Sequence, residues 1–234
     1  MIKVIAFRAI DEPELCLQYA TGHRKVLESF NITNISTNNL EWSLNPDVYA
    51  VVAISEKNGN LLGGIRIQIA NGINPLPIED AVAHFDPKIY DMVKSYSENG
   101  GTSEICGLWN SREEAPNMGI TLILVLAGLV ITNQLPITSL FTVAASYTLK
   151  IAKQIGFKIE KDVGINGEFV YPNSNWVARV LSMNPHLLLH TYHNFKERVL
   201  LLRNNLIFEN LEPTPNDEGI VVKYDLKLKN ITEH

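Results

Sequence analysis

The sequence has few cysteines and no concentrated positive charge, and each shortage excludes a class of protein. Its 234 residues include only Cys16 and Cys106, neither in a C-x-x-C pair, which predicts two buried free thiols in a reducing compartment. Lys and Arg number 20 against 25 Asp and Glu, a formal net charge of −5, and they form no basic tract. We therefore expect no nucleic-acid partner. A charged fraction of 19% and a hydrophobic fraction of 46% exclude a disordered chain and predict a sizeable core.

Long apolar runs are also scarce. The most apolar stretch is ITLILVLAGLVI at residues 120–131, whereas a helix that spans a bilayer needs about 20 residues. The first ten residues are typical of a strand and not of a signal peptide. We therefore expect residues 120–131 to form a buried core helix, and we expect a cytoplasmic protein with no membrane span.

The hydrophobic periodicity predicts alternating strands and helices. Residues 48–55 and 61–70 read as two strands joined by the turn Lys-Asn-Gly-Asn, a hairpin signal. Residues 78–97 read as one or two helices interrupted near Asp86-Pro87. The whole order is β-α-β-β-(α)-β-α-β-α-β-β, which predicts an α/β or α+β fold whose mixed sheet carries helices on both faces.

Four further elements complete this prediction. Asp11 is placed to cap a first helix that begins near Pro13. Residues 187–191 are strand-like, residues 194–211 read as a helix, and residues 220–229 alternate as a half-exposed strand. No internal repeat and no linker divides the chain.

The stretch SEICGLWNSREEAPNMG at residues 103–119 is the most informative part of the sequence. It begins as an apolar strand, continues as a polar loop containing Pro116, and leads directly into the apolar helix. A strand that ends at the N-terminus of a helix can bind a phosphate or a thioester, because the first backbone N–H groups of the helix are free.

Four short stretches carry a family resemblance. They are HRKV at residues 23–26, LLGGIRI at 61–67, SEIC at 103–106, and the strand, helix and Gly-Phe pair of 141–157. In this order and spacing they resemble the GNAT superfamily of N-acyltransferases. Within it, the pattern is most similar to the acyl-homoserine-lactone (autoinducer) synthases and the N-acyltransferases that depend on acyl-carrier protein.

The resemblance implies a fold and a domain division. The fold is a GNAT-like mixed, mostly antiparallel twisted sheet with splayed central strands and helices on both faces. Residues 1–172 would form the acyltransferase domain. Residues 173–234 would form a C-terminal extension that packs on this domain or completes it.

The resemblance also implies an activity. The protein would transfer an acyl group from a phosphopantetheine thioester, either acyl-coenzyme A or acyl-carrier protein, to a small-molecule amine, without a metal ion. The implied catalytic residues are Glu104 and Arg66. The implied donor-binding residues are Cys106, Gly107, Leu108, Trp109, Asn117 and Gly119. The implied substrate-binding residues are Arg24, Trp42, Phe141 and Tyr147.

Glu104 has a chemical argument of its own. It is the only acid in an otherwise apolar strand, so burial would raise its pKa toward the range of a working base. The alternatives are a carboxylate paired with Arg66 or one exposed where the strand begins. Arg66 would orient Glu104 or a substrate carboxylate, or would simply face solvent. Trp42 and Trp109 would line an acyl pocket or pack in the core.

The chain departs from the family pattern at several positions. Where the synthases have Glu-Ser-Arg-Phe, this chain has Glu-Ile-Cys-Gly from Glu104 onward, and the usual superfamily tyrosine falls near Ala152. The acids Glu113 and Glu114 precede the central helix and would repel a pyrophosphate, which favours a carrier-bound thioester over free coenzyme A. Two alternatives stay open: a non-catalytic acyl- or pantetheine-binding protein with the same fold, and an unrelated α/β protein.

Three histidines lie close together in the sequence. His186, His190 and His193 would share one face if all three lay on a helix. Asn184-Pro185 begins this stretch, however, and no H-E-x-x-H motif is present. We therefore expect no metal site.

Overall fold

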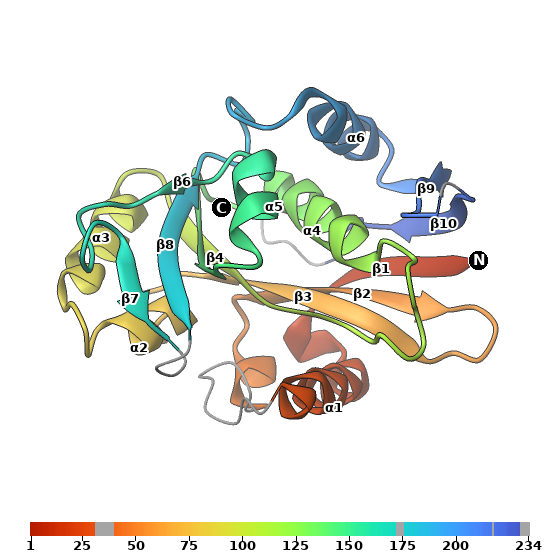
Figure 1. Cartoon of the computed structure of the whole chain (residues 1–234), viewed down its shortest axis with the longest axis horizontal. Helices are drawn as coiled ribbons and strands as arrows, with labels where there is room; N and C mark the ends of the chain where they lie inside the picture. The colour runs from red at the N-terminus through yellow and green to blue at the C-terminus, as the bar shows by residue number, and fades with distance from the viewer. Residues whose placement is uncertain (31–39, 172–175, 217, 230–234) are drawn as a thin grey trace.

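One continuous open sheet organises the molecule (Figure 1). The structure, a computed structural model, describes residues 1–30, 40–171, 176–216 and 218–229. The strands run in the order β6-β8-β5-β4-β3-β2-β1-β10-β9, and β7 pairs with β8. The pairs β4–β5 and β1–β10 are parallel, and the other paired strands are antiparallel. The prediction of a mixed, mostly antiparallel sheet is confirmed.

The elements are short and closely spaced. The strands are β1 (Ile2–Arg8), β2 (Val48–Ser55), β3 (Leu61–Ile69), β4 (Thr102–Asn110), β5 (Ser139–Ala145), β6 (Lys158–Ile159), β7 (Glu168–Val170), β8 (Val177–Met183), β9 (Ile207–Glu212) and β10 (Ile220–Asp225). The helices are α1 (Pro13–Ser29), α2 (Pro77–Val82), α3 (Lys88–Glu98), α4 (Ile120–Ile131), α5 (Leu149–Ile155) and α6 (His193–Asn204). The expected hairpin joins β2 to β3, and the expected interruption separates α2 from α3.

Helices cover both faces of the sheet, as expected. Helix α1 packs under β3 and β4, and α4 packs on the opposite face against β2, β3 and β4 (Figure 1). Helix α6 lies outside α4, while α2 contacts β4 and β5 beside the α1 layer. The sheet thus separates two layers of helices. A gap between two neighbouring strands would open a passage from one layer to the other.

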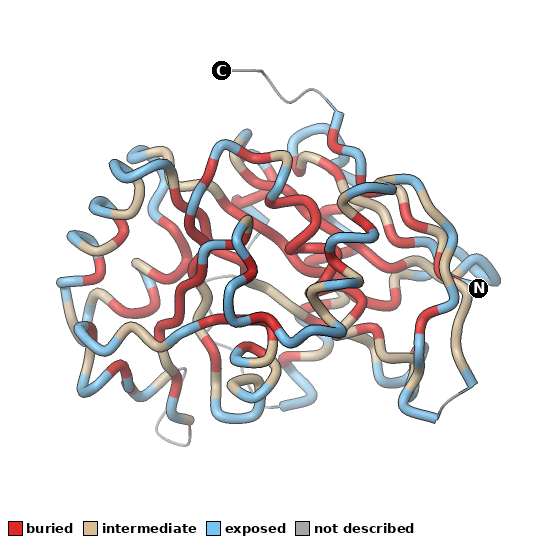
Figure 2. The backbone as a smooth tube through the Cα atoms, turned by 90° about the horizontal axis from the view of Figure 1, so that it is seen from above, coloured by how far each residue is buried: buried red, intermediate tan, exposed pale blue. Residues whose placement is uncertain are grey.

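The helix α4 is the centre of the largest apolar core. Ten of its residues are buried, because the sheet covers one side of the helix and α6 covers the other (Figure 1). Buried residues gather along the middle of the molecule (Figure 2). This explains why the helix is apolar all round instead of amphipathic. Across the described residues, none of the helices has the length and apolarity needed to cross a bilayer.

Residues beyond 172 supply several strands of the same sheet. Strand β8 lies between β6 and β5, and the β9–β10 hairpin extends the sheet beyond β1. Buried Glu212 on β9 accepts hydrogen bonds from Arg198 of α6 and, at 2.8 Å, from the hydroxyl of Tyr224 on β10. This cluster joins α6 to the hairpin.

Some local predictions are wrong, for identifiable reasons. Asp11 does not cap α1: it ends a 3-10 turn, and Glu12 precedes the helix without a side-chain capping bond. Residues 187–191 form turns and not a strand, because the Asn184 side chain accepts the N–H groups of His186 and Leu187.

The helix predicted over residues 194–211 is too long. Helix α6 ends at Asn204, and Ile207–Glu212 pair with β10 as strand β9. The exposure of β9 alternates along the chain, as expected for a strand with one covered face. Tertiary pairing with β10 therefore overrides the local helical preference. Strand β8, between residues 177 and 183, was not predicted.

Candidate active site

The central strands β4 and β5 separate after a short paired stretch. Their register runs only from Thr102–Ser139 to Glu104–Phe141, although β4 continues to Asn110 and β5 to Ala145. Beyond Glu104, each strand therefore turns an unpaired backbone edge toward the other. Such an edge can hydrogen-bond an extended ligand in place of the missing strand.

A bulge in β4 bends it away from β5. The register with β3 shifts between Gly64 and Arg66, and Gly107 has a positive φ of 62°. The hydroxyl of Tyr19 on α1 donates a hydrogen bond to the Gly107 carbonyl. A Cβ atom at residue 107 would lie 2.7 Å from the Tyr19 hydroxyl oxygen, so only glycine fits this bend without strain.

A pocket of about 250 Å³ occupies the gap between the two strands. One part of its wall lies on the α1 and α2 side and includes His23, Pro77, Ala81, Glu104 and Cys106. Another part lies on the α4 and α5 side and is apolar: Ile105, Val125, Ile151, Ala152, Ile155 and Phe157. The pocket therefore reaches both helical layers through the opening in the sheet.

Glu104 lies at the polar side of this pocket. Its side chain is only 2% exposed, and its Oε2 atom accepts the backbone N–H of Ile78, on α2, at 2.6 Å. Burial raises the pKa of Glu104 to about 8, against the opposing effects of the Ile78 hydrogen bond and the positive charge of Arg66. The carboxyl group therefore exchanges a proton near neutral pH, as a general base must.

Arg66 lies behind this wall and does not line the pocket. It is 2% exposed, its guanidinium stacks 4.8 Å over the Trp42 ring, and its Nε donates to the Cys106 sulfur at 3.3 Å. Among the described residues, its Nη1 atom has no hydrogen-bond partner and no carboxylate pairs with the guanidinium. Arg66 therefore acts on the pocket through its charge.

Cys106 lines the pocket as a thiol. Burial raises its pKa to about 11, although the nearby Arg66 charge and hydrogen bond oppose this effect. A cysteine with this pKa is protonated at neutral pH and is a poor nucleophile. Cys106 is therefore unsuited to act as a nucleophile in this pocket.

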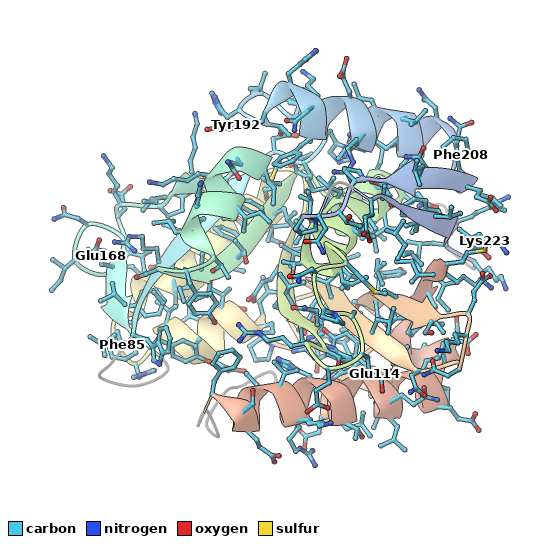
Figure 3. All side chains as sticks on the ribbon, turned by 45° about the vertical axis from the view of Figure 1, so that its right-hand side comes forward. Phe85, Glu114, Glu168, Tyr192, Phe208 and Lys223 are labelled. Atoms are coloured by element: carbon cyan, nitrogen blue, oxygen red, sulfur yellow. The ribbon has the colours of Figure 1, made fainter. Side chains whose placement is uncertain are left out.

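The loop before α4 carries its carboxylates in fixed positions. Glu113 pairs with Lys25 of α1 at 2.7 Å, and Glu114, labelled in Figure 3, accepts a hydrogen bond from Asn60 at 3.2 Å. Gly119 precedes the first turn of α4 with a φ of 70°. An incoming pyrophosphate would meet an acidic loop here.

Some of the expected site residues line the pocket, and others do not. Glu104, Cys106, Gly107, Leu108 and Tyr147 line it. Arg66, Trp109, Asn117, Gly119, Arg24, Trp42 and Phe141 do not.

The residues outside the pocket have other surroundings. Trp42 and Trp109 pack edge-on against Tyr19, with ring centroids 5.3 and 5.9 Å away, and Arg24 is exposed. Phe141 is fully buried against Tyr96. The two tryptophans thus belong to the core on the α1 side.

Sequence reasoning missed several lining residues. His23, Ala81, Thr142 and Trp176 all face the pocket. The one available signal was His23, a titratable residue within the apolar stripe of the first helix. Ala152, at the position of the usual superfamily tyrosine, also lines the pocket, so no hydroxyl group is supplied from that residue.

Solved structures share this architecture at low sequence identity. FeeM, an N-acyl amino acid synthase from uncultured soil microbes, superposes with a TM-score of 0.59 at 14% identity, over 82% of this chain and 99% of its own. BjaI, a CoA-dependent acyl-homoserine lactone synthase, gives a TM-score of 0.56 at 12% identity, over 85% of this chain and 90% of its own. An acyl-CoA N-acyltransferase from Pseudomonas aeruginosa gives 0.52 at 14% identity, over 78% and 99%.

These likenesses identify the fold. No protein-family model and no curated protein sequence matches the chain. The chain has the fold of the GNAT N-acyltransferases, as its short sequence stretches predicted.

Proposed function

We propose that the protein is an N-acyltransferase that moves an acyl group from a phosphopantetheine thioester to an amine. The observation that carries this proposal is the pocket in the gap between β4 and β5, which has Glu104 at one side and an apolar wall at the other. The unpaired edge of β4 would bind the thioester arm, and the apolar wall would take the acyl chain. The fold shared with known N-acyltransferases supports the same assignment.

The chemistry follows from these positions. The amine nitrogen attacks the thioester carbonyl carbon, and the Glu104 carboxylate takes a proton from that nitrogen. Backbone N–H groups on the free edge of β4 stabilise the negative charge on the carbonyl oxygen. The C–S bond then breaks, the thiolate leaves and is protonated, and an amide remains.

The proposal also names the acyl donor, which is either free coenzyme A or acyl-carrier protein. Phosphates of free coenzyme A would lie near the loop that contains Glu114, whose carboxylate is bonded by the neutral amides of Asn58 and Asn60, and like charges there cost binding energy. A carrier protein holds its single phosphate at its own surface, so we propose acyl-carrier protein as the donor.

Release of free thiol tests the function directly. Purified protein would be incubated with acyl-carrier-protein and acyl-coenzyme-A thioesters of several chain lengths, each with and without pooled amino acids and simple amines. Acceptor-dependent release with acyl-carrier protein supports the full proposal, and release with coenzyme A alone reverses the donor assignment. Tight thioester binding without release would instead favour a non-catalytic acyl-binding protein.

Enlarging Ala152 should shorten the preferred acyl chain. Ala152 on α5 is 7% exposed and lines the apolar side of the pocket, so the ring of Ala152→Phe would occupy space intended for the chain. We expect kcat/KM for the longest accepted acyl group to fall about tenfold while that for a short acyl group changes little. Competition between long and short thioesters measures this preference.

A matched control lies on the opposite wall. Ala81→Val adds volume beside Glu104 on the α2 side, where the acceptor would bind. It should raise the KM for the amine and leave the ranking of acyl chains unchanged. If both variants shift chain length equally, the division of the pocket into acyl and acceptor sides is wrong.

A further inference from the structure

His23 is a buried histidine that faces the pocket. It lies on α1, is 5% exposed, and lines the same pocket as Glu104. Helices α1 and α2 lie on the same side of the sheet (Figure 1), and the Glu104 carboxylate accepts a hydrogen bond from the backbone of α2, so Glu104 projects toward that side. His23 and Glu104 therefore approach the pocket from the same helical layer.

The two ring nitrogens of His23 lack hydrogen-bond partners within the described part of the chain. Its ring makes an edge contact with Tyr19, whose hydroxyl already donates to Gly107. By contrast, the half-buried His186 has a polar partner for each ring nitrogen, Asn133 and the Ile137 carbonyl. Neither nitrogen is among the fully buried side-chain atoms that lack a partner, so the imidazole keeps its polar edge open to the pocket, where a ligand can hydrogen-bond it.

The surroundings keep this imidazole neutral. Burial, together with the positive charge of Arg66, lowers the pKa of His23 to about 4. A neutral imidazole has one N–H donor and one nitrogen lone pair. It can therefore accept a hydrogen bond from an amine without repelling it.

We propose that His23 binds the acyl acceptor by accepting a hydrogen bond from its amino group. This assignment rests on the proposed N-acyltransferase function and adds a residue to it. A neutral primary amine has two N–H groups and one lone pair. One N–H would donate a hydrogen bond to His23, and the other would lose its proton to Glu104. The lone pair of the nitrogen would attack the thioester carbonyl carbon.

The number of N–H groups on the acceptor also predicts which acceptors the site prefers. A secondary amine has a single N–H and an alcohol a single O–H, so neither can serve His23 and Glu104 together. Either acceptor would leave His23 or Glu104 without its hydrogen bond in the closed complex, which weakens binding by roughly five- to 150-fold. His23 therefore selects primary amines.

Kinetics of His23 variants test this role. His23→Phe keeps a ring of similar size but removes both nitrogens, and it should raise the KM for a primary amine at least about tenfold while the KM for the thioester changes less than about twofold. His23→Gln, which retains a donor and an acceptor, should restore part of this loss. His193→Gln, at a surface position on α6, is the control and should behave as wild type.

The stability of His23→Phe separates binding from a structural role. The His23 ring nitrogens bond no other described residue, so their removal should leave Tm unchanged or raised. A lowered Tm together with equal losses for both substrates would show that His23 supports the fold, and an unchanged KM for the amine would also overturn the assignment.

A binding experiment keeps this test independent of turnover. Protein labelled with ¹⁵N in the histidine rings would be saturated with acyl-carrier protein whose phosphopantetheine carries an S-dodecyl group, a thioether that cannot react, and titrated with n-hexylamine or with N-methylhexylamine. We expect the His23 ring resonances, assigned with His23→Gln, to shift with the primary amine and much less with the secondary one. Amine binding that leaves these resonances unmoved, or no amine binding, overturns the role of His23. Absent thiol release together with a His23 shift refutes only the transferase function.

Discussion

Replacing Glu104 with glutamine is expected to reduce kcat/KM by about 10²- to 10⁴-fold, the usual contribution of a general base. The substitution keeps the size of the side chain and an oxygen that can accept the Ile78 N–H. It removes only the ability to take a proton from the amine. Thiol release under saturating thioester, measured as a function of amine concentration, gives the change.

The pH profile identifies the group responsible. The carboxylate form of Glu104 is the base, and its pKa is about 8, so kcat/KM calculated on the concentration of neutral amine should rise about tenfold per pH unit below pH 8 and level off above it. Glu104→Gln should lose this rising limb. A variant that keeps both the activity and the limb would exclude Glu104 as the base.

The same pKa shift predicts a cost in stability. Because the pKa of Glu104 is higher in the folded protein than in the unfolded chain, the folded state retains a proton that the unfolded chain releases at lower pH. The free energy of unfolding should therefore decline as pH rises from about 4.3 to about 8. Glu104→Gln should weaken this decline and be at least as stable as wild type at pH 8, which thermal unfolding across this range would show.

Replacing Arg198 with methionine should have the largest effect on folding. Arg198 pairs with Glu212, whose side chain is 1% exposed, and the substitution would leave this carboxylate buried without its counter-charge. Removing one partner of a buried ion pair costs about 3–5 kcal/mol. Chemical denaturation measured by circular dichroism would give the loss in the free energy of unfolding.

An exposed ion pair on the same hairpin is the control. Lys223 of β10, labelled in Figure 3, pairs with Glu56 at 3.0 Å, and both side chains are partly exposed. Lys223→Met should therefore cost no more than about 1 kcal/mol. Comparable losses in the two variants would show that burial of Glu212 is unimportant.

The Arg198 variant also bears on the organisation of the chain. The residues beyond 172 supply β8 near one end of the sheet and β9 and β10 at the other end. We therefore expect a single cooperative unfolding transition, which shifts as a whole in Arg198→Met. Early loss of the C-terminal hairpin alone would show that residues 173–234 unfold as a separate unit.

The parts of the fold that the sequence predicted are those with strong local patterns. The apolar run 120–131 formed the buried α4, and the turn at residues 57–60 joined β2 to β3. Predictions failed where long-range pairing decides the structure. Strand β9 forms because β10 lies beside it, and its own residues gave a helical pattern.

Some residues of the candidate site could be predicted from local sequence patterns, and others could not. Glu104 was found because an acid within an apolar strand is unusual, and the structure buries it in the pocket wall. Arg66 was expected either to orient a carboxylate or to face solvent, and it does neither: it is buried, stacks on Trp42 and bonds the pocket residue Cys106 from behind. His23 gave only a weak signal, because a histidine in an apolar helical stripe is most often an ordinary core residue.

The sequence alone determined the helices and strands with strong periodicity, the short stretches that resemble GNAT proteins, and the position of one unusual acid. Only the tertiary structure decided that β4 and β5 part after Glu104, and that His23 and Glu104 share the resulting pocket. The reason is that local patterns report interactions between neighbours in the chain. A pocket wall and a shifted pKa depend on which distant side chains exclude water from the same space.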